Sequence, residues 1–269
     1  MTHKFDLDTA LERKDDSTFL GATNRDWWVE RGPHGGFLAA LMLRAMKNTV
    51  SDPSRPVRSL TVHYIAPPTH GTLEVNTTIE RVGKSRISTS ARLLQEGATK
   101  ALALAAFSSA WRSVEWAETT MPAVPAPSRL DPLPVGNGLS PPFFSNFDAR
   151  PALGDWPFTG STKALSGGWI RFSERRPLDD IAIAAFADAW MPSVFTRLDR
   201  PIAVPTVDLT VHFRAALPLE EATPDDYLLA VFRSETAADG FFVEDGDIWS
   251  AEGRLIAQAR QLAVLMSGT

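Results

Sequence analysis

The stretch Leu60-Thr61-Val62-His63-Tyr64 returns later in the chain as Leu209-Thr210-Val211-His212-Phe213. Each copy alternates apolar and polar residues, which is the period of a β-strand with one buried face. Each copy also lies a short distance after an unusually apolar helical stretch and before further strand-like runs. An internal repeat with this shared context indicates a duplicated structural unit.

The segments around the repeat occur in the same order in both halves of the 269-residue chain. The strand-like segments that open, follow and close the two copies are Phe19–Arg31, Leu73–Glu80, Arg86–Leu94, Lys100–Trp111, Phe143–Ala149, Gly168–Ser173, Tyr227–Glu235 and Arg254–Met266. Residues 121–142 contain seven prolines, which interrupt both helices and central strands. We therefore predict an N-terminal unit over residues 1–120, a proline-rich linker over 121–142 and a C-terminal unit over 143–269.

Two apolar helices are expected, one in each half. Residues Gly35–Lys47 show no polar face for two turns, and Ile181–Trp190 is apolar apart from one residue, with Asp179 or Asp180 available to cap its start. A helix that is apolar all round is buried all round, and a curved antiparallel sheet is the simplest cover for it. One central helix wrapped by a sheet, occurring twice, is a tandem hot-dog arrangement of the α+β class.

The exception in the second helix is Asp188, which is the only charged residue between Ile181 and Phe195. A carboxylate in such surroundings loses hydration, so it must be protonated or receive hydrogen bonds. One interpretation is a structural Asp that faces solvent or bonds to a neighbouring strand. The other is a general base with a shifted pKa in the mouth of a site.

The second candidate feature is His34-Gly35-Gly36, at the start of the first helix. Two glycines allow a ligand to approach the backbone, and free N–H groups at a helix start attract an oxyanion. A thioester carbonyl is a suitable guest, because its oxygen gains negative charge when water attacks. A tight turn that leads into the helix and binds nothing would contain the same residues, and His34 could orient that turn.

At these residues the sequence resembles the hot-dog thioesterases, and its double layout is similar to the acyl-CoA thioesterase II family over nearly the whole chain. In that family an Asp, a Thr and a Gln together activate a water. The resemblance places these roles on Asp188, on Thr206 in Val204–Asp208, and on Gln261 in the last strand. Gln258 is an alternative to Gln261 if the strand register differs. The resemblance implies that His34, Gly35 and Gly36 bind the substrate.

The candidate residues are divided between the two halves. The first helix has the glycines but Leu41-Met42-Leu43 where an acid would lie, and the second has the acid but no glycine in Asp179–Ala184. We therefore expect one complete site per chain. The expected function is hydrolysis of acyl-CoA by activated water, with no metal and no cofactor beyond the CoA of the substrate. The alternatives are a non-catalytic acyl-CoA-binding protein and an enoyl- or hydroxyacyl-CoA hydratase or dehydratase. The latter normally needs a His beside the acid, and none lies near Asp188 in the sequence.

Composition limits the partners. The net charge of −5 is spread without blocks, which argues against a nucleic-acid surface. The chain has no cysteine, so disulfides, thiolate metal sites and a cysteine nucleophile are excluded. No run approaches about 18 consecutive apolar residues, so we expect no membrane partner and a cytoplasmic location. Hot-dog sheets have long edges that pair, so a homodimer is also expected.

Overall fold

The structure is a computed structural model that describes residues 3–136, 140–219, 223 and 226–266. Its strands in the N-terminal half are β1 (Glu12–Arg13), β2 (Thr18–Ala22), β3 (Val57–Tyr64), β4 (Thr72–Val82), β5 (Arg86–Gln95) and β6 (Ala98–Ser108). Those in the C-terminal half are β7 (Phe147–Gly154), β8 (Ala164–Phe172), β9 (Thr206–Phe213), β10 (Leu228–Ala238), β11 (Phe241–Trp249) and β12 (Leu255–Val264). The helices are α1 (Lys4–Asp8), α2 (Gly35–Val50) and α3 (Asp180–Phe186), with short 3-10 turns at Arg25–Trp27, Pro127–Arg129, Pro142–Asn146 and Ser193–Thr196.

The two repeated segments lie side by side at the centre of one sheet. In the described residues, twelve strands follow the order β1-β2-β4-β5-β6-β3-β9-β12-β11-β10-β8-β7, all paired antiparallel. Across the β3–β9 junction, Thr61 faces Thr210 and their hydroxyl oxygens are 3.0 Å apart. Leu60 faces Val211 and Val62 faces Leu209, so equivalent positions of the repeat are related by a local two-fold axis at the threonine pair.

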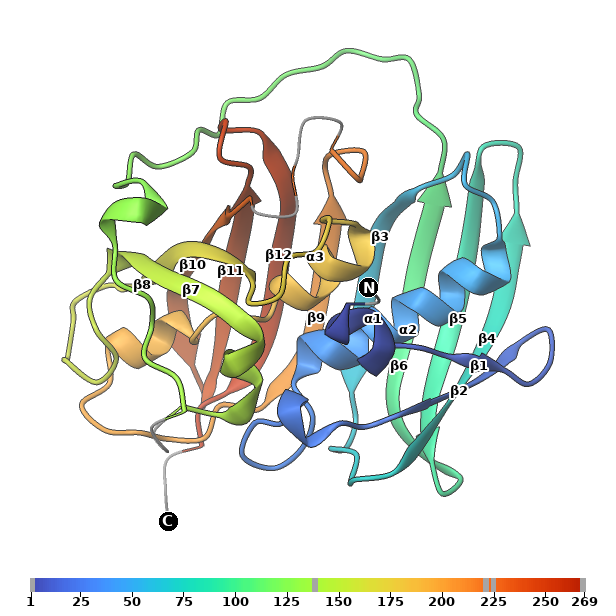
Figure 1. Cartoon of the computed structure of the whole chain (residues 1–269), viewed down its shortest axis with the longest axis horizontal. Coiled ribbons are helices and arrows are strands. Elements are labelled where there is room, and N and C mark those ends of the chain that lie inside the picture. Colours follow the sequence, from blue (N-terminus) through green and yellow to red (C-terminus); the bar gives the residue numbers. More distant parts are fainter. Residues whose placement is uncertain (1–2, 137–139, 220–222, 224–225, 267–269) are drawn as a thin grey trace.

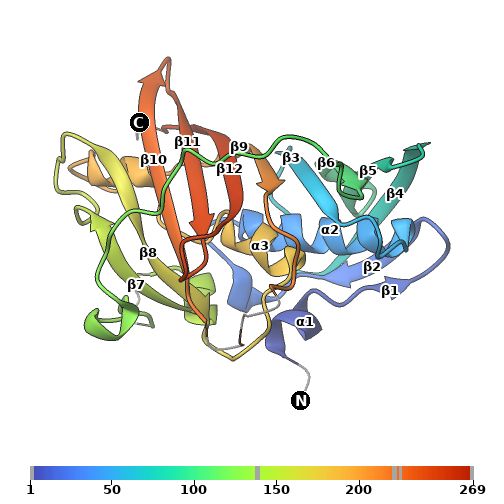
Figure 2. The same cartoon turned by 90° about the horizontal axis from the view of Figure 1, so that it is seen from above.

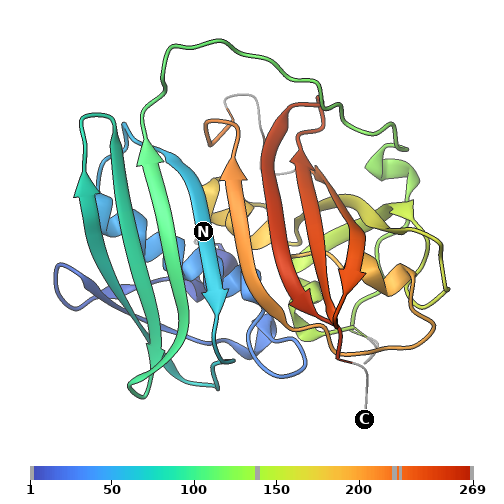
Figure 3. The same ribbon diagram turned by 180° about the vertical axis from the view of Figure 1, so that it is seen from behind.

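The helices α2 and α3 cover one face of this sheet (Figures 1 and 2), and the view from behind shows the strands in front of them (Figure 3). Ten residues of α2 are buried, which explains its apolar sequence on every side. Leu41 is fully buried, and its truncation to Ala would destabilise the fold by about 2–5 kcal/mol. The core continues from α2 through α3 to both halves of the sheet.

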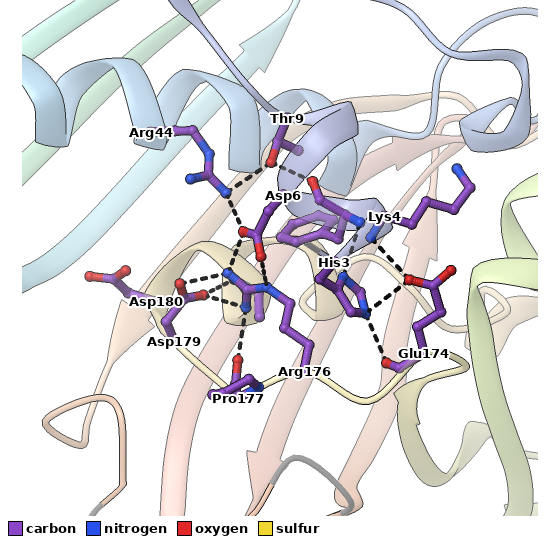
Figure 4. Close-up of polar contacts among 12 residues, drawn as sticks. His3, Lys4, Asp6, Thr9, Arg44, Glu174, Arg176, Pro177, Asp179 and Asp180 are labelled. Carbon is purple, nitrogen blue, oxygen red and sulfur yellow. Dashed lines mark hydrogen bonds and ion pairs between the residues drawn. The ribbon is translucent and has the colours of Figure 1, made fainter. Parts of the chain in front are cut away.

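The N-terminal helix α1 is tied to the segment before α3 by a charged cluster (Figure 4). The guanidinium of Arg176 donates to Asp6 at 2.9 and 3.0 Å and to Asp179 at 2.8 and 2.9 Å. Arg44 on α2 also donates to Asp6, at 3.0 Å. The cluster therefore joins the two halves of the chain at the end of the helix pair where α3 begins.

Several sequence-based boundaries are corrected. The second helix ends at Phe186 rather than Trp190, because the amides of Asp188 and Ala189 bond three residues back and tighten the last turn. The expected opening strand Phe19–Arg31 ends at Ala22 and is followed by a 3-10 turn.

The proline-rich segment contacts the C-terminal half of the chain. Its backbone carbonyl at Pro125 accepts from the Trp169 indole at 2.8 Å, and Arg150 donates to the carbonyl of Leu130 at 3.1 Å. The segment therefore packs along β7 and β8. Its residues 137–139 lie outside the described residues, as do 1–2, 220–222, 224–225 and 267–269 of the two predicted units.

Candidate functional site

The start of α2 and the turn after α3 meet at Asp188. His34 directly precedes α2, but its side chain makes no capping hydrogen bond to the helix. Instead, the Gly36 amide donates to Oδ2 of Asp188 at 2.9 Å. Gly36 is the second residue of α2, so the Asp188 carboxylate serves as the N-cap of a helix from the other half of the chain.

Both glycines are required by the close approach of α2 to this turn. A Cβ added at Gly35 would lie 2.7 Å from Oδ2 of Asp188, and one at Gly36 would lie 2.5 Å from the carbonyl oxygen of Ala185. Neither glycine has a positive φ, so the requirement is for space rather than for backbone freedom. The Gly-Gly sequence therefore allows the carboxylate to reach the helix start.

His34 also contacts the turn at Asp188. Its Nε2 lies 2.5 Å from the backbone carbonyl oxygen of Asp188 and 3.2 Å from Oδ2. Because a carbonyl oxygen only accepts, Nε2 carries the proton and donates to it. The ring stacks on Phe143 at a centroid distance of 4.3 Å and is 3% exposed.

The Asp188 side chain is 15% exposed, and burial raises the pKa of its carboxyl group above the ordinary value of 3.8. His34 and the Gly36 amide act in the opposite direction but do not cancel the effect of burial. Tyr64 lies on the same side of the site, and its hydroxyl donates to the Gly35 carbonyl at 2.9 Å. Burial, followed by the charge of Asp188, raises the pKa of Tyr64 well above its ordinary value. The site thus favours a carboxyl group that takes up a proton readily.

A second group of polar side chains lies on strands of the C-terminal half of the sheet. The Thr206 hydroxyl on β9 donates to Oε1 of Gln261 on β12 at 3.1 Å. The Nε2 of Gln261 donates to Glu244 on β11 at 2.7 Å. Burial raises the pKa of Glu244, and the charge of Asp188 adds a smaller rise, while the hydrogen bonds with Ser193 and Gln261 act in the opposite direction.

The structure therefore arranges the predicted residues in two groups. His34, Gly35 and Gly36 contact Asp188, while Thr206 contacts Gln261. Among the described residues, no direct hydrogen bond joins Asp188 to Thr206 or Gln261. The Gly36 amide, which we expected to be free for an oxyanion, is taken by Asp188 in this structure. Gln258 lies on the opposite face of β12, where it contacts Asp247 and Arg214.

Two residues of the site were not predicted. Glu244 belongs to β11, which the sequence analysis did not identify because three acidic residues interrupt its apolar pattern. Tyr64 ends the first copy of the repeat, where the second copy has Phe213. The added hydroxyl was the only signal for Tyr64, and its partner is the Gly35 carbonyl.

The described residues also bear on metals and membranes. Within them, no three or more His, Asp or Glu side chains gather in a way that could hold a metal ion. Over the same part of the chain, none of the helices combines the length and apolarity needed to cross a bilayer.

Solved structures similar to this one have the same architecture over their whole length. A conserved protein of unknown function with the hot-dog fold from Alicyclobacillus acidocaldarius is 30% identical, with both chains fully covered and a TM-score of 0.91. A putative thioesterase II from Thermobifida fusca is 23% identical, with 98% of each chain covered and a TM-score of 0.83. The acyl-CoA thioesterase II TesB2 from Mycobacterium marinum is 21% identical, covering 98% of this chain and 99% of its own, with a TM-score of 0.79. At these lower identities the last two similarities establish the fold alone.

Sequence models of protein families give the decisive comparison, since the search of curated proteins returned no match. Residues 24–108 match the model of the acyl-CoA thioesterase N-terminal domain. Residues 121–265 match the model of the acyl-CoA thioesterase C-terminal domain. The two matches contain both groups of site residues and follow each other in the order that the family models require. The chain therefore belongs to the acyl-CoA thioesterase family, and its fold is the hot-dog fold.

Proposed function

We propose that the chain hydrolyses acyl-CoA thioesters to a carboxylic acid and free CoA, with Asp188 as the general base. The observation that carries the proposal is the Asp188 carboxylate, which the Gly36 amide holds at the start of α2 with a raised pKa. A base whose pKa is moved toward neutrality is more effective in proton transfer. Membership of the acyl-CoA thioesterase family supplies the substrate class.

In the proposed reaction, Oδ2 of Asp188 at first accepts from the Gly36 amide, and Oδ1 takes a proton from water. The oxygen of Thr206 accepts from the same water, since the Thr206 proton is donated to Gln261. The water oxygen bonds to the thioester carbon, the carbon–sulfur bond breaks, and the leaving CoA thiolate takes the proton from Asp188, which returns to the carboxylate. The carbonyl oxygen gains negative charge at the first turn of α2, where backbone amides stabilise it. A protonated Asp188 is a weaker acceptor, which frees the Gly36 amide for that oxygen as the charge develops.

We also propose that the chain is two hot-dog units in tandem, over residues 1–120 and 143–269, with one site per chain. The two-fold relation of the repeated strands supports the duplication. Position Val57 in the N-terminal half corresponds to Thr206 in the repeat register, so the hydroxyl of the second half has no equivalent in the first. The expected homodimer and the absence of a cofactor remain predictions, the first of which light scattering of the purified protein would test.

A hydratase or dehydratase is the second candidate, because the fold brings His34 next to Asp188 although the sequence does not. An acid–His pair is the arrangement that such chemistry needs. The geometry favours a positioning role for this histidine, since its proton is donated to a backbone carbonyl and its ring is buried against Phe143. The hydrolase is therefore the better supported function.

The test is the release of free CoA thiol from a panel of short to long acyl-CoAs by the wild type and by Asp188→Asn. Loss of turnover in the variant, with acyl-CoA binding retained, would support the proposal and the panel would give the chain length. Asp180→Asn is a matched control, because Asp180 lies at the opposite end of α3 and pairs with Lys47. Unchanged turnover in Asp188→Asn would eliminate the general-base role. Binding without turnover by the wild type would indicate an acyl-CoA-binding protein, and loss of the double bond of an enoyl-CoA would indicate a hydratase.

A further inference from the structure

Glu244 is a buried carboxylate that lies one strand away from the expected water site. It is 3% exposed, and in the sheet it stands directly opposite Gln261. Its Oε1 accepts from the Ser193 amide at 2.5 Å, and its Oε2 accepts from Nε2 of Gln261 at 2.7 Å. Both partners are N–H donors, so the surroundings are arranged for an ionised acceptor.

The contact decides which way the Gln261 carboxamide points. With Nε2 on Glu244, Oε1 must face Thr206, and the Thr206 hydroxyl donates to it at 3.1 Å. The hydroxyl proton is then used in the hydrogen bond to Gln261, and the lone pairs of the Thr206 oxygen are available to accept from a water. If the carboxamide turned over, its NH2 group would face Thr206 and the hydroxyl proton would point elsewhere.

We propose that Glu244 is a positioning residue of the hydrolysis, which fixes the Gln261 carboxamide and through it the direction of the Thr206 hydroxyl. This inference rests on the proposed function, because it assigns the role relative to a water that Asp188 activates. Glu244 does not itself touch the substrate in this scheme. It acts through two hydrogen bonds, the first to Gln261 and the second from Thr206 to Gln261.

The equivalent place in the N-terminal half indicates that the fold does not require this acid. Along the sheet, Glu244 faces Gln261, which faces Leu209, and in the first half Thr89 faces Ala105, which faces Leu60. Leu60 and Leu209 are equivalent in the repeat, so Thr89 and Ala105 correspond to Glu244 and Gln261. Thr89 is fully buried and carries no charge. The acid–amide pair therefore belongs to the half that also holds Asp188.

The decisive variant is Glu244→Gln, which keeps the volume and removes the charge. A Gln side chain offers one acceptor oxygen, so its NH2 group must face either the Ser193 amide or Gln261, and one contact is lost. We expect kcat to fall on the order of 10²-fold, as for a displaced catalytic group, with KM changed little.

A swap of the two residues restores the network. In Glu244→Gln with Gln261→Glu, the new Gln accepts from the Ser193 amide and donates to the new Glu, whose other oxygen accepts from Thr206. We expect part of the lost kcat to return. Asp247→Asn is the matched control, because Asp247 accepts from Gln258 between the same two strands at 3.1 Å but on the opposite face. This control should leave kcat unchanged.

Two results would overturn the inference. The first is a loss of kcat in Glu244→Gln that matches the loss of folded protein, with no recovery in the swap. The second is independent of turnover: side-chain NH2 resonances of Gln261 in the NMR spectrum that are the same in the wild type and in Glu244→Gln. Because this measurement needs no substrate, a wild type without hydrolase activity would refute the proposed function while the measurement still tests the contact between Glu244 and Gln261.

Discussion

Gly36 and Asp188 are 152 positions apart in the chain, yet the amide of one donates to the carboxylate of the other at 2.9 Å. The contact stabilises the start of α2 and also holds the proposed base. An acidic side chain at a helix N-terminus is favoured by the partial positive charge of the free amides. One hydrogen bond therefore combines a structural role with the proposed chemical role.

Adding a methyl group at Gly35 and adding one at Gly36 should have different effects on kcat and on stability. Gly35→Ala meets the Asp188 carboxylate, which can move, so we expect a large loss of kcat with a small loss of stability. Gly36→Ala meets the backbone carbonyl of Ala185, so we expect destabilisation of about 1–3 kcal/mol. Thermal unfolding and thiol release from the same preparations test this contrast. Equal effects on stability in both variants would contradict it.

The hydrolysis rate should depend on pH through Asp188. The base acts when ionised, and burial raises its pKa above the ordinary value of 3.8, with His34 and Gly36 opposing the shift. We expect kcat to decline on the acid side at a pH higher than an exposed Asp would give. Circular dichroism at each pH controls for unfolding. A kcat that stays constant down to pH 3.8 would argue against Asp188 as the base.

Asp188→Asn should not reduce stability at neutral pH. The amide oxygen of Asn still accepts from the Gly36 amide, and the substitution removes a charge whose burial is unfavourable. Because the folded-state pKa of Asp188 is raised, the ionised carboxyl lowers stability above the pH at which it deprotonates. The stability of the variant relative to the wild type should therefore increase as pH rises through the acidic range and then become constant. Urea titrations at several pH values measure this difference, and a variant less stable at neutral pH would contradict it.

The charged cluster around Arg176 should contribute to stability but not to catalysis. Arg176→Met leaves Asp6 and Asp179 without their main partner, and we expect a loss of about 2–3 kcal/mol, since both carboxylates are about a third exposed. Burial would raise the pKa of Asp6, but Arg176 and Arg44 outweigh it and hold the pKa below the ordinary value. This stabilisation is present above the unfolded-state pKa of Asp6 and is lost as pH falls through the folded-state value. The difference between wild type and variant should therefore shrink in acid, while kcat at low temperature is unchanged.

The fold was predictable because its signals are local. The alternation in Leu60–Tyr64 and Leu209–Phe213 and the apolar residues of α2 are readable without knowledge of distant contacts. The end of α3 was not predictable, because Asp188 leaves the helix to reach Gly36, and this partner lies in the other half of the chain.

The site was predictable in part. Asp188 was identified from its isolation among apolar residues, whereas Thr206 and Gln261 were inferred from resemblance to a family. Glu244 was missed because its contact with Gln261 depends on the register between β11 and β12, which no local pattern specifies. Likewise, no feature near His34 in the sequence indicates that its ring reaches the backbone of Asp188.

The pairing of Thr61 with Thr210 joins two copies of a strand within one polypeptide. In an assembly of identical subunits, any substitution at such an axis appears twice and alters both copies of the site. Here each copy is encoded separately, so a change at Val57 leaves Thr206 untouched. The covalent connection also keeps His34 and Asp188 in one molecule, so their contact should not depend on the protein concentration.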